Sequence, residues 1–316
     1  MSTGDSFLVT ARRVRGGAFG AEPGKSRFLL VPDGGAPSPA HATSRRAWTK
    51  AVLEAGHTHQ EPKTGADCGD IVVIVHGYNT SPEGTLELHR RLCRSLTAAG
   101  YAGAIVSFDW PSDDQALNYL EDRTDAKLTA LRLVDDCISL LVAARYPACR
   151  INVHVVAHSM GAYVVREAFD DADDRPALAS ANWNVSQLCF VGADVSQGSM
   201  AATDARSRSL YRHCNRLTNY SNEHDRVLKL SNIKRIGVAP RAGRRGLPPD
   251  RPATAANVDC SDHFAAQYAD SGDSGHSWYF EDPVFVGDLV ATLKGDDAER
   301  TTARRRVAPD GRLLLA

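Results

Sequence analysis

The sequence has few of the features that mark disulfide-stabilised, zinc-binding or membrane-spanning proteins. Its seven cysteines are an odd number without a Cys-x-x-Cys pair, which argues against a disulfide framework and against a zinc site. Such cysteine usage is typical of a reducing compartment. No apolar run approaches the length of about 18 residues that a membrane-spanning helix needs. We therefore expect no integral membrane association.

Charge of one sign is not in excess either. Lysine and arginine number 37 and aspartate and glutamate 38, a net charge of −1 that argues against nucleic acid or an anionic membrane as a partner. Near the N-terminus, Arg12, Arg13 and Arg15 follow the apolar stretch Phe7–Val9 instead of preceding it, the reverse of a signal peptide. We expect a cytoplasmic protein whose partner is a small molecule. The oligomeric state does not follow from the sequence.

The pattern of apolar residues predicts an α/β fold. Ile71–Val75 is a continuous β-branched run, typical of a strand that is buried on both faces of a parallel sheet. Further strand-like segments at 104–108, 151–157, 188–191, 216–220 and 256–258 alternate with helical segments at 82–99, 113–146 and 161–169. This alternation predicts a central, mostly parallel sheet flanked by helices.

The two ends of the chain have a different character. Residues 1–65 contain two short strand-like segments, 7–10 and 28–31, and loops that we expect to join the sheet edge. We take residues 1–293 as a single domain. Residues 294–316 show no convincing period, and we expect them to form a mobile tail, with a tail that docks on the body as the alternative.

A serine lies between the strand-like segment Ile151–Ala157 and a helical segment that begins at Gly161. A strained strand-to-helix turn of this kind exposes the hydroxyl of a nucleophile, and it needs small residues two positions before and after the serine. Ala157 and Gly161 meet this need around Ser159. The alternative interpretation makes Ser159 a helix N-cap.

Two backbone amides are candidates for an oxyanion hole. Met160 follows the serine, and its N–H lies at the start of the following helix. The second donor of such a site comes from the loop after an earlier strand. We assign it to Tyr78, in the loop His76–Asn79 that follows Ile71–Val75.

A nucleophilic serine also needs a base, and the base needs a carboxylate that holds its tautomer. In the order serine, acid, base, Asp225 follows the strand at 216–220, with Glu223 and Asp194 as alternatives. His276 follows the last strand-like segment at the end of a Gly/Ser loop, with His263 as the alternative.

Five motifs in one order resemble a largely uncharacterised, mostly bacterial family of α/β-hydrolases that are similar to esterases and lipases. They are His76–Asn79, Phe108–Ser112, Ala157–Gly161, Ser221–Leu228 and Gly275–Tyr279, within a resemblance that spans about residues 7–289. The resemblance implies an α/β-hydrolase fold with N-terminal antiparallel strands. It implies Ser159 as nucleophile, Asp225 as acid and His276 as base, with the amides of Tyr78 and Met160 as oxyanion donors.

The resulting hypothesis is a serine hydrolase that cleaves carboxylic esters through an acyl-enzyme. A non-catalytic binding module on the same fold, or a thioesterase or amidase that uses the same site, is the alternative. Tyr119 and Asp122, near the start of the long helical segment, are expected to line the acyl pocket. We expect no cofactor and no metal, since a serine triad needs none and His57 and His59 lack accompanying carboxylates or cysteines.

Overall fold

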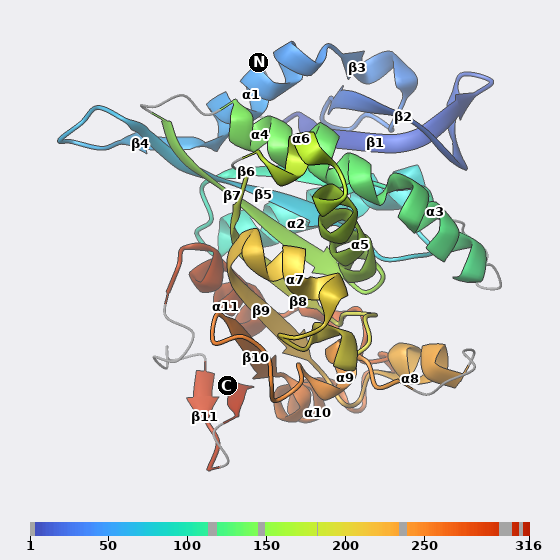
Figure 1. Ribbon diagram of the computed structural model, residues 1–316, viewed down its shortest axis with the longest axis vertical. Coiled ribbons are helices and arrows are strands. Elements are labelled where there is room, and N and C mark those ends of the chain that lie inside the picture. Colours follow the sequence, from blue (N-terminus) through green and yellow to red (C-terminus); the bar gives the residue numbers. More distant parts are fainter. Residues whose placement is uncertain are drawn as a thin grey trace.

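The computed structural model describes residues 4–112, 119–144, 149–181, 183–233, 239–296, 305–309 and 312–316, and of residues 119–125, 149 and 231–233 the backbone alone. Twelve strands of these residues form one mixed sheet (Figure 1). The strands are β1 (Ser6–Arg15), β2 (Ala18–Val31), β3 (Ala42–Thr43), β4 (His57–Gln60), β5 (Asp67–Val75), β6 (Ala104–Asp109), β7 (Cys149–His158), β8 (Val185–Val191), β9 (Cys214–Ser221), β10 (Ala255–Asp259), β11 (Arg305–Val307) and β12 (Leu313–Leu315).

The strand order is β11-β12-β10-β9-β8-β7-β5-β6-β1-β2-β3, and β4 pairs with β5. Every neighbouring pair from β12 to β1 in this order is parallel. Antiparallel pairing occurs at β11, at β4, and at the N-terminal strands β2 and β3. The predicted α/β class, with a mostly parallel sheet and N-terminal antiparallel strands, is confirmed.

Helices cover both faces of the sheet. They are α1 (Arg45–Gly56), α2 (Pro82–Ala98), α3 (Tyr119–Arg132), α4 (Ser139–Ala143), α5 (Gly161–Asp173), α6 (Pro176–Ala179), α7 (Ala205–Arg212), α8 (Arg226–Ile233), α9 (Ala242–Arg245), α10 (Ser261–Tyr268) and α11 (Pro283–Leu293), with shorter 3-10 turns that include η3 (Gly198–Met200) and η4 (Trp278–Glu281).

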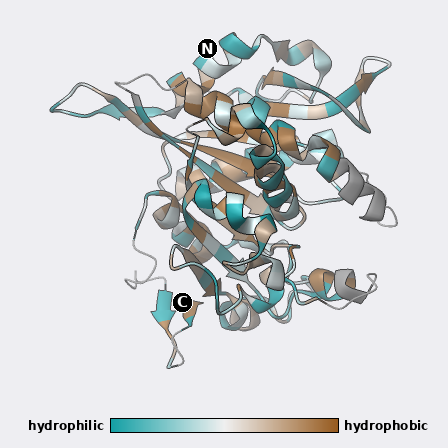
Figure 2. Cartoon of the chain, viewed as in Figure 1, coloured by the Kyte–Doolittle hydropathy of each residue, from teal (hydrophilic) through white to brown (hydrophobic). Residues whose placement is uncertain are grey.

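Alternate side chains of β5 belong to two separate apolar cores. Val73 and Val75 pack in the core that α1, α3, α4, α5 and α7 share with one face of the sheet. Val72 and Ile74 pack in the core of the other face, with α2, α10, α11 and η4. The apolar colouring of the central strands follows this layering (Figure 2). A strand that is apolar on both faces is therefore explained by helices on both sides.

The N-terminal hairpin is longer than predicted. The segments expected at 7–10 and 28–31 extend to ten residues in β1 and fourteen in β2. Gly16 and Gly17 connect them with φ values of +57° and +83°, a combination that suits a tight hairpin turn. β1 pairs in parallel with β6, so that Thr10 lies opposite Asp109. The hairpin thus extends the sheet at its edge.

The helical segment predicted over 113–146 is observed where the chain is described. α3 continues through a π-helical stretch, Leu133–Ile138, into α4. Residues 113–118 and 145–148 lie outside the described residues. Across the described ranges, no helix combines the length and the apolar character of a membrane span.

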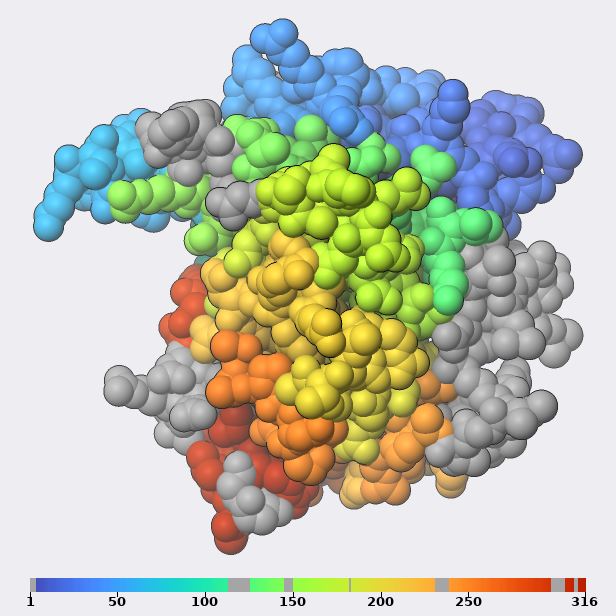
Figure 3. Space-filling model, viewed as in Figure 1, coloured from blue at the N-terminus to red at the C-terminus, as the bar shows by residue number. Residues whose placement is uncertain are grey.

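The C-terminal prediction needs correction. Residues 294–316 were expected to be a mobile tail, but β12 pairs with β10, and β11 pairs with β12. Burial holds these strands: Leu315 is 1% exposed, and the Arg305 side chain contacts Asp288 of α11 at 2.6 Å. Figure 3 shows these C-terminal residues (red) at the end of the molecule opposite the N-terminal strands (blue).

Candidate active site

Ser159 occupies a sharp turn at the carboxyl edge of the sheet, between the end of β7 and the start of α5. Its φ of +55° is unusual for a residue with a side chain. The backbone holds this conformation on both sides, because the Ser159 N–H donates to Val191 O at 3.0 Å and its carbonyl accepts from Asp194 N at 3.0 Å. Such a backbone costs about 1–3 kcal/mol and persists only where the surroundings determine it. The turn has the conformation of a nucleophile elbow.

The small residues around the serine have a steric reason. A Cβ on Gly161 would lie 2.3 Å from the carbonyl oxygen of Val75 and 2.6 Å from that of His76. A Cβ on Gly77 would lie 3.0 Å from the Cβ of Ser159. The elbow therefore packs directly against the end of β5 and the loop that follows it, as the small-residue pattern predicted.

The Asp225 and His276 side chains meet at this edge of the sheet. Nδ1 of His276 lies 2.6 Å from Oδ2 of Asp225, and both residues are buried. The second carboxylate oxygen of Asp225 accepts from Leu228 N at 2.8 Å. A carboxylate on Nδ1 makes Nδ1 the proton-bearing nitrogen and leaves Nε2 available as a base.

The loops that carry this pair are tied together by Asn222, which the sequence analysis did not single out. Its Nδ2 donates to Gly275 O at 2.9 Å, while its Oδ1 accepts from His224 N at 3.0 Å. The Arg226 N–H also donates to Ser274 O at 2.8 Å. An Asn two residues before a turn amide is a recognisable local signal, but its long-range bond to Gly275 is not.

His158 also contacts His276 and was not predicted to do so. Its Nε2 lies 2.9 Å from the carbonyl oxygen of His276, and the ring centroids are 4.8 Å apart. Burial, followed by the nearby His276, lowers the pKa of His158 to about 3. The ring is therefore neutral at pH 7, and its Nε2–H donates to the His276 carbonyl.

The structure separates the alternative acids and the alternative base from this arrangement. Asp194 pairs with Arg241 at 3.0 Å, and both side chains are buried. Glu223 has a side chain that is 56% exposed and lies 3.8 Å from Arg245. His263 pairs instead with Asp282, at 2.9 Å.

One of the two expected oxyanion donors, Tyr78, borders a pocket together with the serine and the histidine. This pocket has a volume of about 640 Å³, and Tyr78, Ser159 and His276 all line it. Met160 is fully buried directly after the serine, at the N-terminus of α5. The remaining lining residues are Gly77, Asn79, Thr80, Ser81, Gly84, Leu88, Arg91, His158, Val227, Ser277 and Phe280.

A second cavity, of about 670 Å³, lies beside α1 and the start of β5. Its described lining contains one histidine, His57, and no serine, so it offers no comparable nucleophile. The prediction for Tyr119 and Asp122 falls on side chains outside the described residues. Within the described part of the chain, no group of three or more His, Cys, Asp or Glu side chains could hold a metal ion.

Comparison with known proteins gives one family. The family model described as "Alpha/beta hydrolase of unknown function (DUF900)" matches residues 58–286, more than half of the chain. An uncharacterised protein from Nostoc sp. is 39% identical over 62 residues, a match that covers 20% of this chain and 15% of that protein.

Solved structures that resemble the chain have low sequence identity. Esterase B from Lactobacillus rhamnosis is 11% identical with a TM-score of 0.41, over 92% of this chain and 85% of that one. A putative cell surface hydrolase from Lactobacillus plantarum is 11% identical with a TM-score of 0.40, over 74% and 93%. A cutinase-like protein from Cryptococcus sp. is 12% identical with a TM-score of 0.38, over 75% and 96%.

The family match confirms the resemblance that the five motifs indicate, and the matched residues include the Ser159, Asp225 and His276 positions. The parallel sheet and the serine turn are those of this fold. The chain therefore belongs to the family of α/β hydrolases of unknown function.

Proposed function

We propose that the protein is a serine hydrolase that cleaves carboxylic esters through a Ser159–His276–Asp225 triad. The observation that carries the proposal is the 2.6 Å contact between His276 Nδ1 and Asp225 Oδ2, beside a pocket that Ser159 lines on a positive-φ turn. This combination gives each member of a triad its part: a serine that lines the pocket, a base with a fixed tautomer and a buried carboxylate.

The reaction follows from these positions. Nε2 of His276 takes the proton of the Ser159 hydroxyl as Oγ attacks the ester carbonyl, and Asp225 stabilises the imidazolium that forms. The N–H groups of Tyr78 and Met160 donate to the negative oxygen of the tetrahedral intermediate. His276 then protonates the departing alcohol. Water attacks the acyl-enzyme by the same route and returns the serine.

The pocket supports small ester substrates. Its volume of about 640 Å³ is in the range of pockets for small organic ligands. Leu88, Val227 and Phe280 provide apolar contacts for an acyl or alcohol group. Esters need less acid assistance than amides for leaving-group departure, which favours them over amides on chemical grounds.

The test compares the wild type with Ser159→Ala on p-nitrophenyl esters of increasing acyl length. We expect kcat to fall by roughly 10³–10⁶ in the variant, the effect of removing a triad nucleophile. A fluorophosphonate probe should label the wild type at Ser159 and leave the variant unlabelled. A wild type that neither turns over esters nor accepts the probe would support the binding-module alternative instead. Preference for thioesters or amides in the same assay would redefine the substrate.

A further inference from the structure

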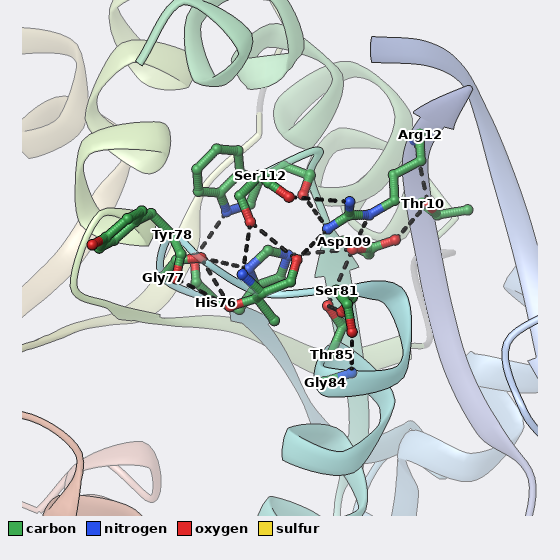
Figure 4. Close-up of polar contacts among 12 residues, drawn as sticks. Thr10, Arg12, His76, Gly77, Tyr78, Ser81, Gly84, Thr85, Asp109 and Ser112 are labelled. Carbon is green, nitrogen blue, oxygen red and sulfur yellow. Dashed lines mark hydrogen bonds and ion pairs between the residues drawn. The ribbon is translucent and has the colours of Figure 1, made fainter. Parts of the chain in front are cut away.

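A buried ion pair connects the N-terminal hairpin to the edge of the candidate active site. Nε of Arg12 donates to Oδ1 of Asp109 at 2.8 Å, and each residue is only 1% exposed (Figure 4). Asp109 also accepts from the hydroxyls of Thr10 at 2.6 Å and Thr85 at 3.1 Å. Burial alone would raise the pKa of Asp109, but Arg12, His76 and the Thr10 hydroxyl outweigh it and hold the pKa well below its usual range.

The remaining N–H groups of Arg12 donate to backbone carbonyls at this edge of the sheet. Its Nη2 donates to Thr80 O at 2.6 Å and to Trp110 O at 3.1 Å. The Ser112 hydroxyl bonds both the N–H and the carbonyl of Thr80, at 3.1 Å each. Thr80 is thereby fixed from two neighbouring segments, one in β1 and one after β6.

The other end of the same loop is fixed through His76. Its ring stacks on Trp110 with centroids 5.4 Å apart, and Trp110 Nε1 donates to His76 O at 2.9 Å. Nε2 of His76 lies 3.3 Å from Oδ1 of Asp109. Residues 76–81, which we call the oxyanion loop, are therefore held at His76 and at Thr80, and Tyr78 lies between these two anchors in the sequence. Figure 4 shows His76 and Tyr78 in this loop.

A buried ion pair is weak evidence for stability, because removing two charges from water offsets much of their attraction. A well-packed apolar pair could replace it in a sheet, but apolar side chains cannot donate to the carbonyls of Thr80 and Trp110. The guanidinium can, because its planar fork presents several donors in fixed directions. An arginine at position 12 is thus explained by the hydrogen bonds that it donates to the carbonyls of Thr80 and Trp110, and not by the packing of the core.

We propose that Arg12 and Asp109 are positioning residues that hold the oxyanion loop, and with it the Tyr78 N–H, in its place beside Ser159. This inference rests on the proposed function. It also gives β1, which precedes the family match at residues 58–286, a part in assembling the site. Neither residue lines the pocket. Arg12 acts through the loop backbone at Thr80, and Asp109 acts through the side chains of Arg12 and His76.

The expected effect is on kcat. Loss of one oxyanion donor lowers kcat by about 10²–10³, and a misplacement of about 1 Å can lower rates by about 10². We expect Arg12→Met to lower kcat for a p-nitrophenyl ester by about 10², with KM changed less than threefold. Arg12→Lys keeps the charge, but its single ammonium group cannot replace all the hydrogen bonds of the guanidinium. Its kcat should therefore lie between those of Arg12→Met and the wild type.

Arg305 provides a matched control. Its guanidinium also makes a buried, two-bond contact with an aspartate, Asp288, at 2.6 Å for both bonds, but at the opposite end of the sheet. Arg305→Met should lower the melting temperature as Arg12→Met does, yet leave kcat within threefold of the wild type. Equal losses of kcat in the two variants, or a loss confined to KM in Arg12→Met, would overturn the proposal.

A second measurement does not depend on turnover. Hydrogen–deuterium exchange should be faster in residues 76–81 of Arg12→Met than in Arg305→Met or the wild type. If the wild type turns over no ester, the proposed function fails, while the exchange result still decides whether Arg12 holds the loop. Unchanged exchange there would refute the positioning role.

Should Arg12→Met not fold, Ser112→Ala removes the hydroxyl that bonds Thr80 and leaves the ion pair intact. It should speed exchange at residues 76–81 and lower kcat by about tenfold, a partial version of the same effect. Wild-type kcat together with wild-type exchange in Ser112→Ala would count against the proposal.

Discussion

The carboxylate of Asp225 lies 2.6 Å from Nδ1 of His276, although the two residues are 51 positions apart in the sequence. Asp225 is fully buried, so its second oxygen depends on a backbone donor, Leu228 N, for its remaining bond. The pair is therefore built to present a histidine in one tautomer and one orientation, and this tautomer can be tested directly.

Asp225→Asn should lower kcat by about 10⁴ while the protein stays folded. The amide keeps the shape of the carboxylate but favours the wrong histidine tautomer, and it cannot stabilise the imidazolium. Ester turnover measured beside circular dichroism would separate loss of activity from loss of fold.

The structure offers a second His–Asp pair as the control. Asp282 lies 2.9 Å from His263 and also caps α11 through Phe285 N. We expect Asp282→Asn to lower the melting temperature but to keep kcat within a few-fold. A larger loss of kcat in Asp282→Asn than in Asp225→Asn would show that Asp225 is not the acid of the triad.

The backbone of Ser159 predicts an unusual order of stability between two inactive variants. Alanine keeps a Cβ at φ +55°, whereas glycine adopts this conformation without strain. The gain is reduced by the larger entropy of glycine in the unfolded chain. We expect Ser159→Gly to exceed Ser159→Ala in unfolding free energy by up to about 1 kcal/mol, measured by urea denaturation. Greater stability of the alanine variant would mean that the turn is not strained.

Gly161 should tolerate no larger side chain. In Gly161→Ala the new Cβ would lie 2.3 Å from Val75 O, so the elbow must move away from β5. We expect a loss of about 1–3 kcal/mol or more in thermal unfolding, and lower activity as the serine shifts. Gly198→Ala serves as the comparison, because nothing lies within 4 Å of its added Cβ. Similar melting temperatures for the two variants would contradict the packing argument.

Stability should depend on pH through a buried histidine outside the pocket. His89 is 2% exposed, and burial, followed by the neighbouring Arg90, lowers its pKa from 6.5 to about 4. Between pH 6.5 and 4 the unfolded chain binds a proton at this residue that the folded protein does not. Stability is therefore complete above pH 6.5 and falls as the pH drops toward 4, by about 1.4 kcal/mol per pH unit for one such group.

His89→Gln should reduce this slope when the unfolding free energy is measured from pH 8 to pH 4. Glutamine can still reach a polar neighbour such as the Ser107 hydroxyl, which lies 2.9 Å from Nδ1 of His89, but it does not titrate. An unchanged slope in the variant would assign the acid sensitivity to other groups. Asp109 adds to the acid loss only at lower pH, since its pKa lies below the usual range.

Much of the fold follows from local pattern. The β-branched run Ile71–Val75 can only be buried on both faces, and the alternation of such runs with helical segments leads to a parallel sheet. Ser159 and Gly161 are likewise recognisable from a local motif, because a serine between small residues at a strand-to-helix junction spans only a few positions. Candidate residues at these positions could be named without any knowledge of distant parts of the chain.

Other assignments depended on which distant segments meet. Three acidic residues follow strands in the sequence: Asp194, Glu223 and Asp225. Only the tertiary structure shows that Asp194 pairs with Arg241 and that Asp225 pairs with His276. In the sequence, Arg305 is part of a basic run, but in the structure it forms an ion pair with Asp288. The segment that was expected to be a mobile tail contains β12, which pairs with β10.

The sequence by itself determined the layered α/β fold, the serine turn and the small residues around it, because these are recognised from periodicity and from a motif of a few positions. The tertiary structure alone decided that Arg12 reaches Asp109 and Thr80, and that Asn222 ties the loop of Asp225 to that of His276. A buried charge or amide takes its partner from whatever segment packs against it, and that segment is fixed only when the whole sheet has formed.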